Sequence, residues 1–272
     1  MKKTTPALAK ELKRILPVAK KAALEAGLFI DSKFGKFKNL KLKADASLVT
    51  EVDRKSEDMV KKILLSKFPS HEVLGEETGL RTDGSNTKSP FRWHIDPLDG
   101  TTNFVHGFPF FCVSIGLEFE EMGPVLGVIY HPLTENMYWA AKGTGAFQNK
   151  KAIHVSKTKN LKDALLSTGF SMRRDEHLTF EIDSFQRMVK GSHAIRRTGS
   201  AALDLTFVAT GQFDGFWERG LNSWDVAAAI TIVREAGGMV SQNDGATHAL
   251  QSKTIVATNS LIHREIIRTL TG

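Results

Sequence analysis

Two aspartates, a proline and a glycine follow a short apolar run in the middle of the chain. The run 93–95 is followed directly by Asp96, Pro97, Leu98, Asp99, Gly100 and Thr101. Because Pro97 restricts the backbone between aspartates only three residues apart, both carboxylates and the Leu98 carbonyl can converge on one small volume. Oxygen ligands of this kind suit Mg²⁺ or Mn²⁺. Taken alone, the same residues also fit an ordinary turn.

Gly100 and Thr101 indicate a second kind of ligand. They can begin a short helix whose first N–H groups lack an intrahelical acceptor and whose dipole is positive at that end. Helix N-termini with these properties bind phosphate. The residues therefore favour a phosphate group held next to a divalent cation.

Three further acidic residues lie at junctions between expected elements. Glu76 follows an apolar pair, Asp53 stands three residues after Thr50, and Asp225 lies within the segment 223–228. Helix capping would explain either aspartate in isolation. The combination of separate acidic segments favours a metal-binding site.

These segments resemble the signatures of the inositol monophosphatase family and occur in the family's order. They are Gly75-Glu76-Glu77, the run 96–104 that begins Asp96-Pro97-Leu98-Asp99, Trp224-Asp225-Val226-Ala227-Ala228, and Glu235-Ala236-Gly237-Gly238. The similarity spans residues 43–272. It implies an α/β (α+β) fold, a layered αβαβα sandwich of the inositol monophosphatase and fructose-1,6-bisphosphatase type.

The resemblance also implies a Mg²⁺-dependent, lithium-sensitive phosphatase with two to three ions, for which Mn²⁺ is an alternative. Glu76, Asp96 and the Leu98 carbonyl would surround one ion. Asp96, Asp99 and Asp225 would surround a second, so that Asp96 bridges the two. A third, weaker ion would lie near Glu76. Relatives are homodimers, and the same is expected here.

Catalysis in the family is direct attack of a metal-activated water on phosphorus. The resemblance implies that Glu76, Thr101 and Asp53 orient and activate this water, and that the amides of Gly100 and Thr101 hold the phosphate. Thr50 keeps the family's Thr-x-x-Asp spacing before Asp53.

The residues themselves favour the same chemistry. Hydrolysis of a phosphate monoester needs an aligned nucleophile, neutralised phosphoryl oxygens and a stabilised leaving alkoxide, and two cations can supply all three. The chain has no Cys-x₅-Arg loop, Asp-x-Asp start or Gly-x-Ser-x-Gly elbow for a covalent route. Its nine histidines form no zinc-binding pattern, and we expect His94, His106 and His131 to be structural.

The metal signature predicts the reaction but not the alcohol. Glu218, seven residues before Asp225, matches a family glutamate that accepts hydrogen bonds from ring hydroxyls, and Gly199, Ser200 and Ala201 resemble the lining of a polyol pocket. We expect inositol 1-phosphate or a similar polyol phosphate as substrate. Relatives with the same metal signature act on histidinol phosphate, fructose 1,6-bisphosphate or 3′-phosphoadenosine 5′-phosphate, which stay as alternatives. The segment 42–47 is closer to several sister branches, which favours keeping histidinol phosphate or a broad substrate range. If Glu218 does not bind substrate, a surface ion pair with Arg219 or with a neighbouring chain would explain it.

Length and composition are those of an ordinary globular protein, with 272 residues, 41% hydrophobic and 25% charged. We expect one phosphatase domain, 1–272, made of two intimate halves of roughly 1–148 and 149–272. No secretion signal or membrane span is visible, so a cytoplasmic location is expected. The single cysteine, Cys112, lies in an apolar run and is predicted to be buried.

The formal charge of +7 permits contact with an anionic partner. Some bacterial proteins that resemble this one bind the transcription and ribosome-assembly machinery, and a binding protein of that kind is the alternative from another class. The lysines are spread along the chain, and no RNA-binding motif is present.

Hydrophobic spacing predicts alternating helices and strands around these motifs. Helices are expected over 6–26, 53–68, 176–190, 200–210, 224–236 and 261–270. Strands are expected over 48–50, 93–95, 113–119, 125–130, 137–140 and 213–217, near 195, and over 255–257. The composition of 81–90 predicts a surface loop.

Overall fold

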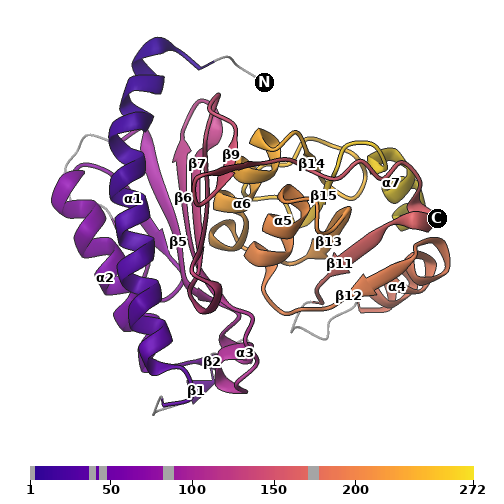
Figure 1. Cartoon of the computed structure of the whole chain (residues 1–272), viewed down its shortest axis with the longest axis horizontal. Coiled ribbons are helices and arrows are strands. Elements are labelled where there is room, and N and C mark those ends of the chain that lie inside the picture. Colours follow the sequence, from indigo (N-terminus) through magenta and orange to yellow (C-terminus); the bar gives the residue numbers. More distant parts are fainter. Residues whose placement is uncertain (1–3, 37–40, 43–47, 82–88, 171–177) are drawn as a thin grey trace.

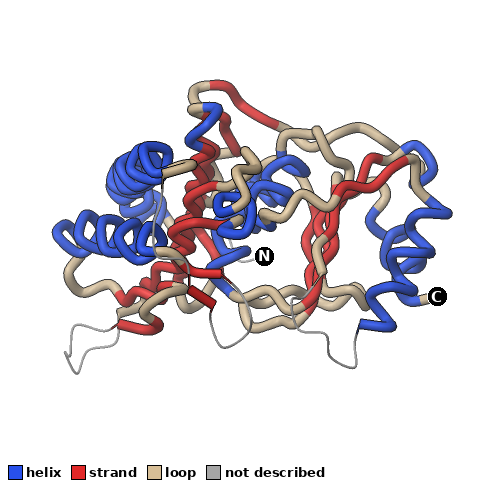
Figure 2. Tube along the Cα trace, turned by 90° about the horizontal axis from the view of Figure 1, so that it is seen from below, coloured by secondary structure: helices blue, strands red, loops and turns tan. Residues whose placement is uncertain are grey.

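Helices and sheets alternate in five layers, which Figure 1 shows from left to right. The computed structural model describes residues 4–36, 41–42, 48–81, 89–170 and 178–272. Two helices cover one face of an eight-stranded sheet, two more lie between this sheet and a five-stranded sheet, and two cover the outer face of the second sheet. Figure 2 shows the same alternation from below. The predicted αβαβα sandwich is confirmed.

Helix α1 (Pro6–Lys33) forms the outermost layer with α2. It begins where Thr5 Oγ1 accepts the N–H of Leu8 at 3.2 Å, with proline at its first position. The apolar face is buried as predicted but continues to Ile30, so the helix extends beyond the expected 6–26.

Helix α2 (Glu51–Lys67) matches the predicted 53–68 within two residues at its start. Its first turn is closed by a capping box, in which Asp53 Oδ2 accepts the N–H of Thr50 at 2.8 Å. The start of the helix thereby fixes the direction of the Asp53 carboxylate. A short antiparallel pair, β1 (Lys41–Leu42) and β2 (Leu48–Val49), precedes it.

The large sheet has the strand order β10-β9-β8-β7-β6-β5-β3-β4. β3 and β5 are parallel, and the other neighbours are antiparallel. The strands are β3 (Glu72–Gly75), β4 (Gly79–Arg81), β5 (Phe91–Asp99), β6 (Cys112–Phe119), β7 (Gly123–His131), β8 (Asn136–Ala141), β9 (Ala146–Gln148) and β10 (Lys151–Ile153).

β5 differs from the prediction because it does not end at residue 95. It continues to Asp99, and its pairing with β6 shifts register between Asp96 and Asp99. The expected turn is therefore an irregular strand end, which directs both aspartates to the edge where the next helix begins. That helix is α3 (Thr101–Val105), as predicted for Gly100 and Thr101.

The central layer consists of α5 (Ala201–Ala209) and α6 (Ser223–Glu235). α6 packs unusually close to β6 and β7 because both strands carry a glycine at the contact. A Cβ on Gly127 would lie 2.1 Å from the Ala228 carbonyl oxygen, and a Cβ on Gly116 would lie 2.6 Å from a side-chain atom of α6. These small residues set how closely α6 approaches the sheet.

The second sheet has the order β12-β11-β13-β15-β14. Its outer face is covered by α4 (Leu178–Gly191) and α7 (His263–Thr271). The strands are β11 (Leu165–Thr168), β12 (Ala194–Arg196), β13 (Gly215–Arg219), β14 (Met239–Ser241) and β15 (Thr254–Thr258), and two short 3₁₀ turns are Pro132–Thr134 and Leu161–Asp163.

Parts of three predictions fall outside the described residues: the segment 43–47, most of the loop 81–90, and the expected start of a helix at 176. Cys112 is fully buried, as expected. Over the described ranges, none of the helices combines the length and apolar character needed to cross a bilayer.

Candidate active site

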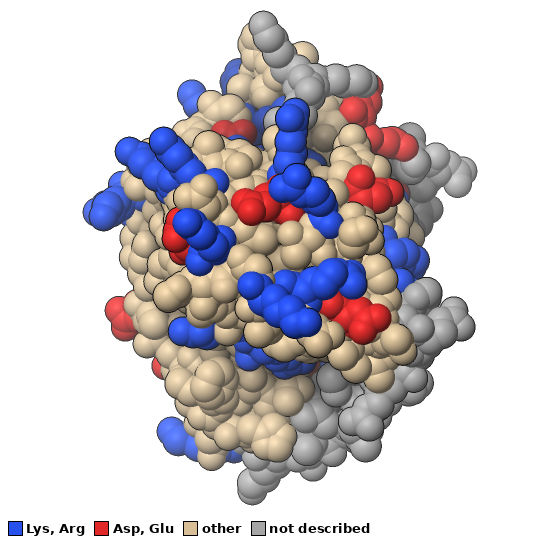
Figure 3. All heavy atoms as spheres, turned by 90° about the vertical axis from the view of Figure 1, so that its right-hand side faces the viewer, with Lys and Arg blue, Asp and Glu red and all other residues tan. Residues whose placement is uncertain are grey.

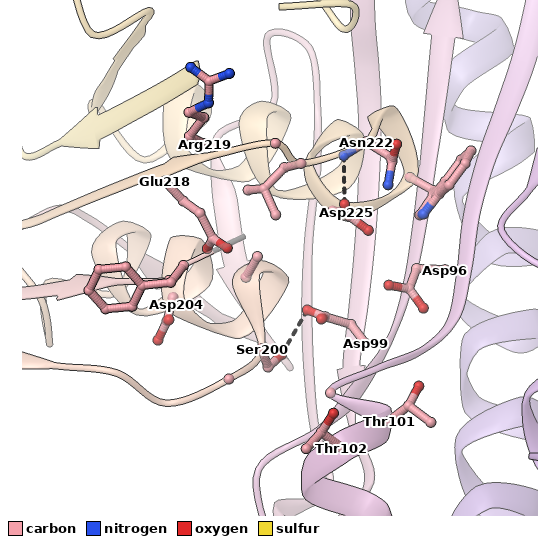
Figure 4. A pocket seen from close by; sticks show the side chains of 18 of the residues that line it. Asp96, Asp99, Thr101, Thr102, Ser200, Asp204, Glu218, Arg219, Asn222 and Asp225 are labelled. Carbon is pink, nitrogen blue, oxygen red and sulfur yellow. Dashed lines mark hydrogen bonds between the residues drawn. The ribbon is translucent and has the colours of Figure 1, made fainter. Parts of the chain in front are cut away.

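A cavity of about 510 Å³ lies where the ends of β5 and β13 approach the first turns of α5 and α6. Figure 4 shows carboxylates from these separate elements gathered around it. Its lining contains every residue predicted for metal, phosphate or alcohol: Glu76, Asp96, Leu98, Asp99, Gly100, Thr101, Gly199, Ser200, Ala201, Glu218 and Asp225. Asp53 is not part of the lining and contacts Thr101 from behind.

The two β5 aspartates are held by different partners. Asp96 is 3% exposed, and its Oδ1 accepts the N–H of Leu98 at 2.9 Å. Asp99 Oδ2 accepts two hydrogen bonds from the start of α5, from the Ser200 hydroxyl at 2.7 Å and from the Ala202 N–H at 2.6 Å. The positive end of the α5 dipole adds to this stabilisation. Both bonds fall on one oxygen, so they fix the direction of the Asp99 carboxylate without using Oδ1.

Electrostatic repulsion is concentrated among these groups. Burial raises the pKa of Asp96 well above its usual value, and the neighbouring Glu76, Asp99 and Asp225 raise it further. Burial also raises the pKa of Asp99 to about 6, although its bonds from α5 lower it. A bound cation would relieve both the burial cost and the repulsion, because each carboxylate could then remain ionised.

The donor set fits a hard divalent cation, since it consists of carboxylate oxygens and a backbone carbonyl. Within the part of the chain that the structure describes, no three His, Cys, Asp or Glu side chains are arranged closely enough to hold a metal ion together. The fit therefore rests on donor chemistry and charge. The candidate ligands share one cavity.

Thr101 connects the cavity to Asp53. Its Oγ1 lies 2.9 Å from Asp53 Oδ1 and 3.0 Å from the Leu98 carbonyl oxygen, both of which are acceptors for its single hydrogen. Asp53 is 1% exposed, and its other oxygen accepts the Thr50 hydroxyl at 2.6 Å. The predicted link between the Thr101 hydroxyl and the Asp53 carboxylate is present.

Gly100 lets the backbone turn into α3 while it lies close to a neighbouring loop. Its φ is 96°, and a Cβ there would lie 2.9 Å from the Phe110 carbonyl oxygen. A side chain is excluded both by this backbone conformation and by the contact. The Nδ2 group of Asn103 then joins α3 to two loops, donating to Phe110 O at 2.7 Å and to Thr198 O at 2.9 Å. The segments before α5 and at the start of α3 are thereby held together.

Asp225 and Asp53 both combine a helix-capping contact with a place at the site. Asp225, in the first turn of α6, accepts the N–H of Asn222 at 2.6 Å through Oδ2 and also lines the cavity. Capping and function, which the sequence presents as alternatives, are therefore compatible for these residues. Glu76 follows β3, and its N–H donates to the Ile95 carbonyl at 3.1 Å.

Glu218 lies at the end of the cavity opposite Asp96 and Asp225 (Figure 4). A Cβ on Gly169 would lie 2.1 Å from its Oε2, so the carboxylate uses the space left by this glycine. Burial raises the pKa of Glu218 well above its usual value; nearby Asp204 raises it further, and Arg197 lowers it. Figure 4 shows the Arg219 side chain directed away from that of Glu218, and no ion pair joins these two described residues.

Several lining residues were not identified from sequence. Asp204 is 1% exposed and lies in α5 between leucines, and an acidic residue in an otherwise apolar helix was the signal that could have identified it. Arg197 and Lys253 carried no such signal because surface cations are common. Gly169 could be recognised only from the position of Glu218 in space.

Charged residues of both signs are interspersed on the face shown in Figure 3, where Lys and Arg side chains lie among Asp and Glu side chains. On this face the net positive charge does not form one uninterrupted basic area. His94 is buried, with its ring nitrogens near Ser223 Oγ and Glu118 Oε2, and His131 is also buried, in agreement with structural roles.

This chain is similar over nearly its whole length to proteins of one family. The model of the inositol monophosphatase family matches residues 11–271. An inositol-1-monophosphatase from Synechocystis is 44% identical over 96% of this chain and 90% of its own length. A fructose-1,6-bisphosphatase/inositol-1-monophosphatase from Aquifex aeolicus is 40% identical over 94% of this chain and 95% of its own. The solved structure of the extragenic suppressor protein suhB from Bartonella henselae is 37% identical, with a TM-score of 0.88, covering 94% of this chain and 98% of that one.

The layered fold and its acidic cavity, together with these relatives, define a phosphatase. The chain belongs to the inositol monophosphatase family. Members of this family are generally Mg²⁺-dependent, which agrees with the donor chemistry of the cavity.

Proposed function

We propose that this protein hydrolyses inositol 1-phosphate, or a similar small polyol phosphate, to the free alcohol and phosphate. The observation that carries the proposal is that one cavity joins the carboxylates of Asp96, Asp99 and Asp225 to the Thr101–Asp53 pair and, at its other end, to Glu218. Such a cavity has places for a phosphate, its counter-charges and a hydroxylated leaving group.

Two to three Mg²⁺ ions would be held by Glu76, Asp96, the Leu98 carbonyl, Asp99 and Asp225. When bound, such ions lower the pKa of an attacking water and stabilise the charge of the phosphate and the leaving oxygen. The side chains contribute the neutralising charge, and the bonds from α5 to Asp99 keep that carboxylate aimed at the cavity.

Thr101 and Asp53 would prepare the nucleophile. With the Thr101 hydroxyl donating to Asp53, its oxygen lone pairs remain able to accept a hydrogen from a water in the cavity. The water is then oriented for in-line attack, and its proton can pass through the hydroxyl to Asp53. Glu76, which also lines the cavity, would assist in orienting the water. The amides of Gly100 and Thr101 would donate to the phosphate oxygens.

Glu218 would select the alcohol. A buried carboxylate that accepts hydroxyl hydrogens discriminates against esters that leave it unpaired. Gly199 and Ala201 would line the polyol, and Ser200 would contribute its backbone, because its hydroxyl donates to Asp99.

A sugar bisphosphate is the second candidate substrate. Arg197, Arg219 and Lys253 line the same cavity, and they could receive a second phosphate group. The name of the Aquifex aeolicus relative supports this candidate.

We further propose that residues 1–272 act as one domain of two halves joined near the β9–β10 hairpin, and that the protein is a homodimer.

Phosphate release would test the proposal. Purified wild type, Asp96→Asn and Asp58→Asn would be assayed with inositol 1-phosphate, histidinol phosphate, fructose 1,6-bisphosphate and 3′-phosphoadenosine 5′-phosphate, in Mg²⁺ or in EDTA. Asp58 is exposed on α2 and serves as the control. We expect inositol 1-phosphate to react fastest, only with Mg²⁺ and not with Asp96→Asn. Preference for another ester would reassign the substrate, and no metal-dependent release at all would favour a binding protein.

A further inference from the structure

A buried carboxylate outside the cavity contacts the segment that carries Glu76. Glu57, on α2, is fully buried. Its Oε2 accepts the N–H of Glu77 at 2.8 Å, and its Oε1 accepts the Thr78 hydroxyl at 2.6 Å. Both contacts lie immediately after Glu76 in the chain, at the connection between β3 and β4.

The same carboxylate also touches the residue before Glu76. A Cβ built on Gly75 would lie 2.5 to 2.6 Å from the carboxylate carbon and both oxygens of Glu57. These distances are far below normal contact. Glu57 therefore fills the space that a side chain at position 75 would need. Glu57 therefore restrains the backbone on both sides of Glu76 without lining the cavity itself.

Lys61 completes the arrangement one turn later on α2. Its Nζ lies 2.6 Å from Glu57 Oε1 and also contacts the Thr78 hydroxyl, and the two charged side chains are 5% and 0% exposed. A buried ion pair often contributes no more stability than apolar side chains of the same volume, because desolvation offsets the attraction. Its presence beside an acidic cavity calls for another explanation, which its contacts with residues 75–78 provide.

We propose that Glu57 is a positioning residue, which holds residues 75–78 so that the Glu76 carboxylate projects into the cavity. Lys61 neutralises the charge of Glu57, so that this support adds no further negative charge next to the candidate metal ligands. The inference rests on the proposed function, because Glu76 needs this placement only where the cavity binds cations.

The test is Mn²⁺ binding to the metal-free, full-length protein, followed by the electron paramagnetic resonance signal of free Mn²⁺. Glu57→Ala is expected to weaken the site that includes Glu76 at least tenfold. Sites formed by Asp96, Asp99 and Asp225 should keep their affinity. Glu57→Gln should give a smaller loss, since it keeps the volume but places an amide NH₂ among the donors around it. In the activity assay, the Mg²⁺ concentration for half-maximal rate should rise by a similar factor.

Glu72→Gln is the matched control. Glu72 lies on β3, and its carboxylate accepts two hydrogen bonds from Arg92, at 2.6 and 2.8 Å; among the described residues it forms no hydrogen bond with residues 75–78. It should lower the urea midpoint of unfolding without changing the Mn²⁺ curve. Equal Mn²⁺ curves for Glu57→Ala and wild type, or equal losses for Glu57→Ala and Glu72→Gln, would overturn the inference.

A double variant separates packing from positioning. In Glu57→Ala/Gly75→Ala, the new methyl group at 75 enters the space vacated by the carboxylate. It should recover part of the lost stability but none of the lost Mn²⁺ affinity. Recovery of both would overturn the inference, because packing alone would then explain Glu57. Mn²⁺ binding without phosphate release in wild type would refute only the proposed function, whereas absence of Mn²⁺ binding in wild type would refute both.

Discussion

Replacing Asp99 by asparagine should stabilise the metal-free protein and at the same time remove its metal-dependent activity. The amide oxygen of asparagine can still accept the bonds from Ser200 and Ala202, so the start of α5 keeps its partner. The charge that burial and the neighbouring carboxylates oppose is removed. A variant that loses function and gains stability is the expected result of a site strained by its own ligands.

The magnitude follows from the pKa of Asp99, which is raised from 3.8 to about 6. This difference corresponds to about 3 kcal/mol at neutral pH, as an upper limit because the carboxylate is only half-buried. The sign is that of an acid whose folded-state pKa lies above its unfolded value. The contribution of Asp99 to the stability of the metal-free wild type therefore falls as pH rises from about 4 to about 6 and stays constant above that range.

Urea unfolding in EDTA measures this effect. At pH 7.5, Asp99→Asn should unfold with a free energy up to about 3 kcal/mol above wild type, and at pH 4 the gain should fall below about 1 kcal/mol. Asp58→Asn, exposed on α2, should show no such gain. With saturating Mg²⁺, Asp99→Asn should be stabilised less than wild type, because it keeps the carboxylates proposed for the first ion but loses one proposed for the second. Equal or lower stability of Asp99→Asn in EDTA at pH 7.5 would refute the electrostatic reasoning.

Three further predictions concern single side chains. Thr101→Val removes the hydroxyl that donates to Asp53 and should lower kcat by about 10²- to 10⁴-fold in phosphate-release assays, with Mn²⁺ binding unchanged; an unaltered kcat would argue against this proton path. Glu218→Gln should reduce kcat/KM for inositol 1-phosphate by about 10- to 100-fold but leave phenyl phosphate unaffected, and equal losses for both esters would exclude a role in alcohol selection. Gly100→Ala should lower the free energy of unfolding by about 1–3 kcal/mol in urea, because its φ of 96° and the nearby Phe110 carbonyl disfavour a side chain.

The fold and about half of the residues that line the cavity could be predicted, because they depend on local patterns and on a motif order that the family shares. The periodicity of α1 and α2, the apolar strands and the acidic segments were all visible in the sequence. The end of β5 was not, because Asp, Pro and Gly are turn residues and only the pairing with β6 keeps Asp96 to Asp99 within a strand.

Contacts between distant segments could not be predicted from local patterns. Glu57 and Lys61 have the i, i+4 spacing of an exposed helical ion pair, and only the packing of α2 beneath the β3–β4 connection buries them. The role of Gly169 likewise cannot be predicted from its neighbours in the sequence. A glycine is needed there only because Glu218, 49 residues further along the chain, occupies the space of a side chain. Side chains that support a site are harder to recognise from sequence than those that line it.

Two backbone amides can serve as spectroscopic reporters of the site. The N–H of Ala202 donates to Asp99, and the N–H of Asn222 donates to Asp225, each at 2.6 Å. A carboxylate that shares electron density with a cation becomes a weaker acceptor, so both amide hydrogen bonds should lengthen during a metal titration. The amide resonances of residues 202 and 222 would then shift separately in nitrogen-15 spectra, each following one carboxylate. The first turns of α5 and α6 would thus record the order in which these two aspartates engage cations.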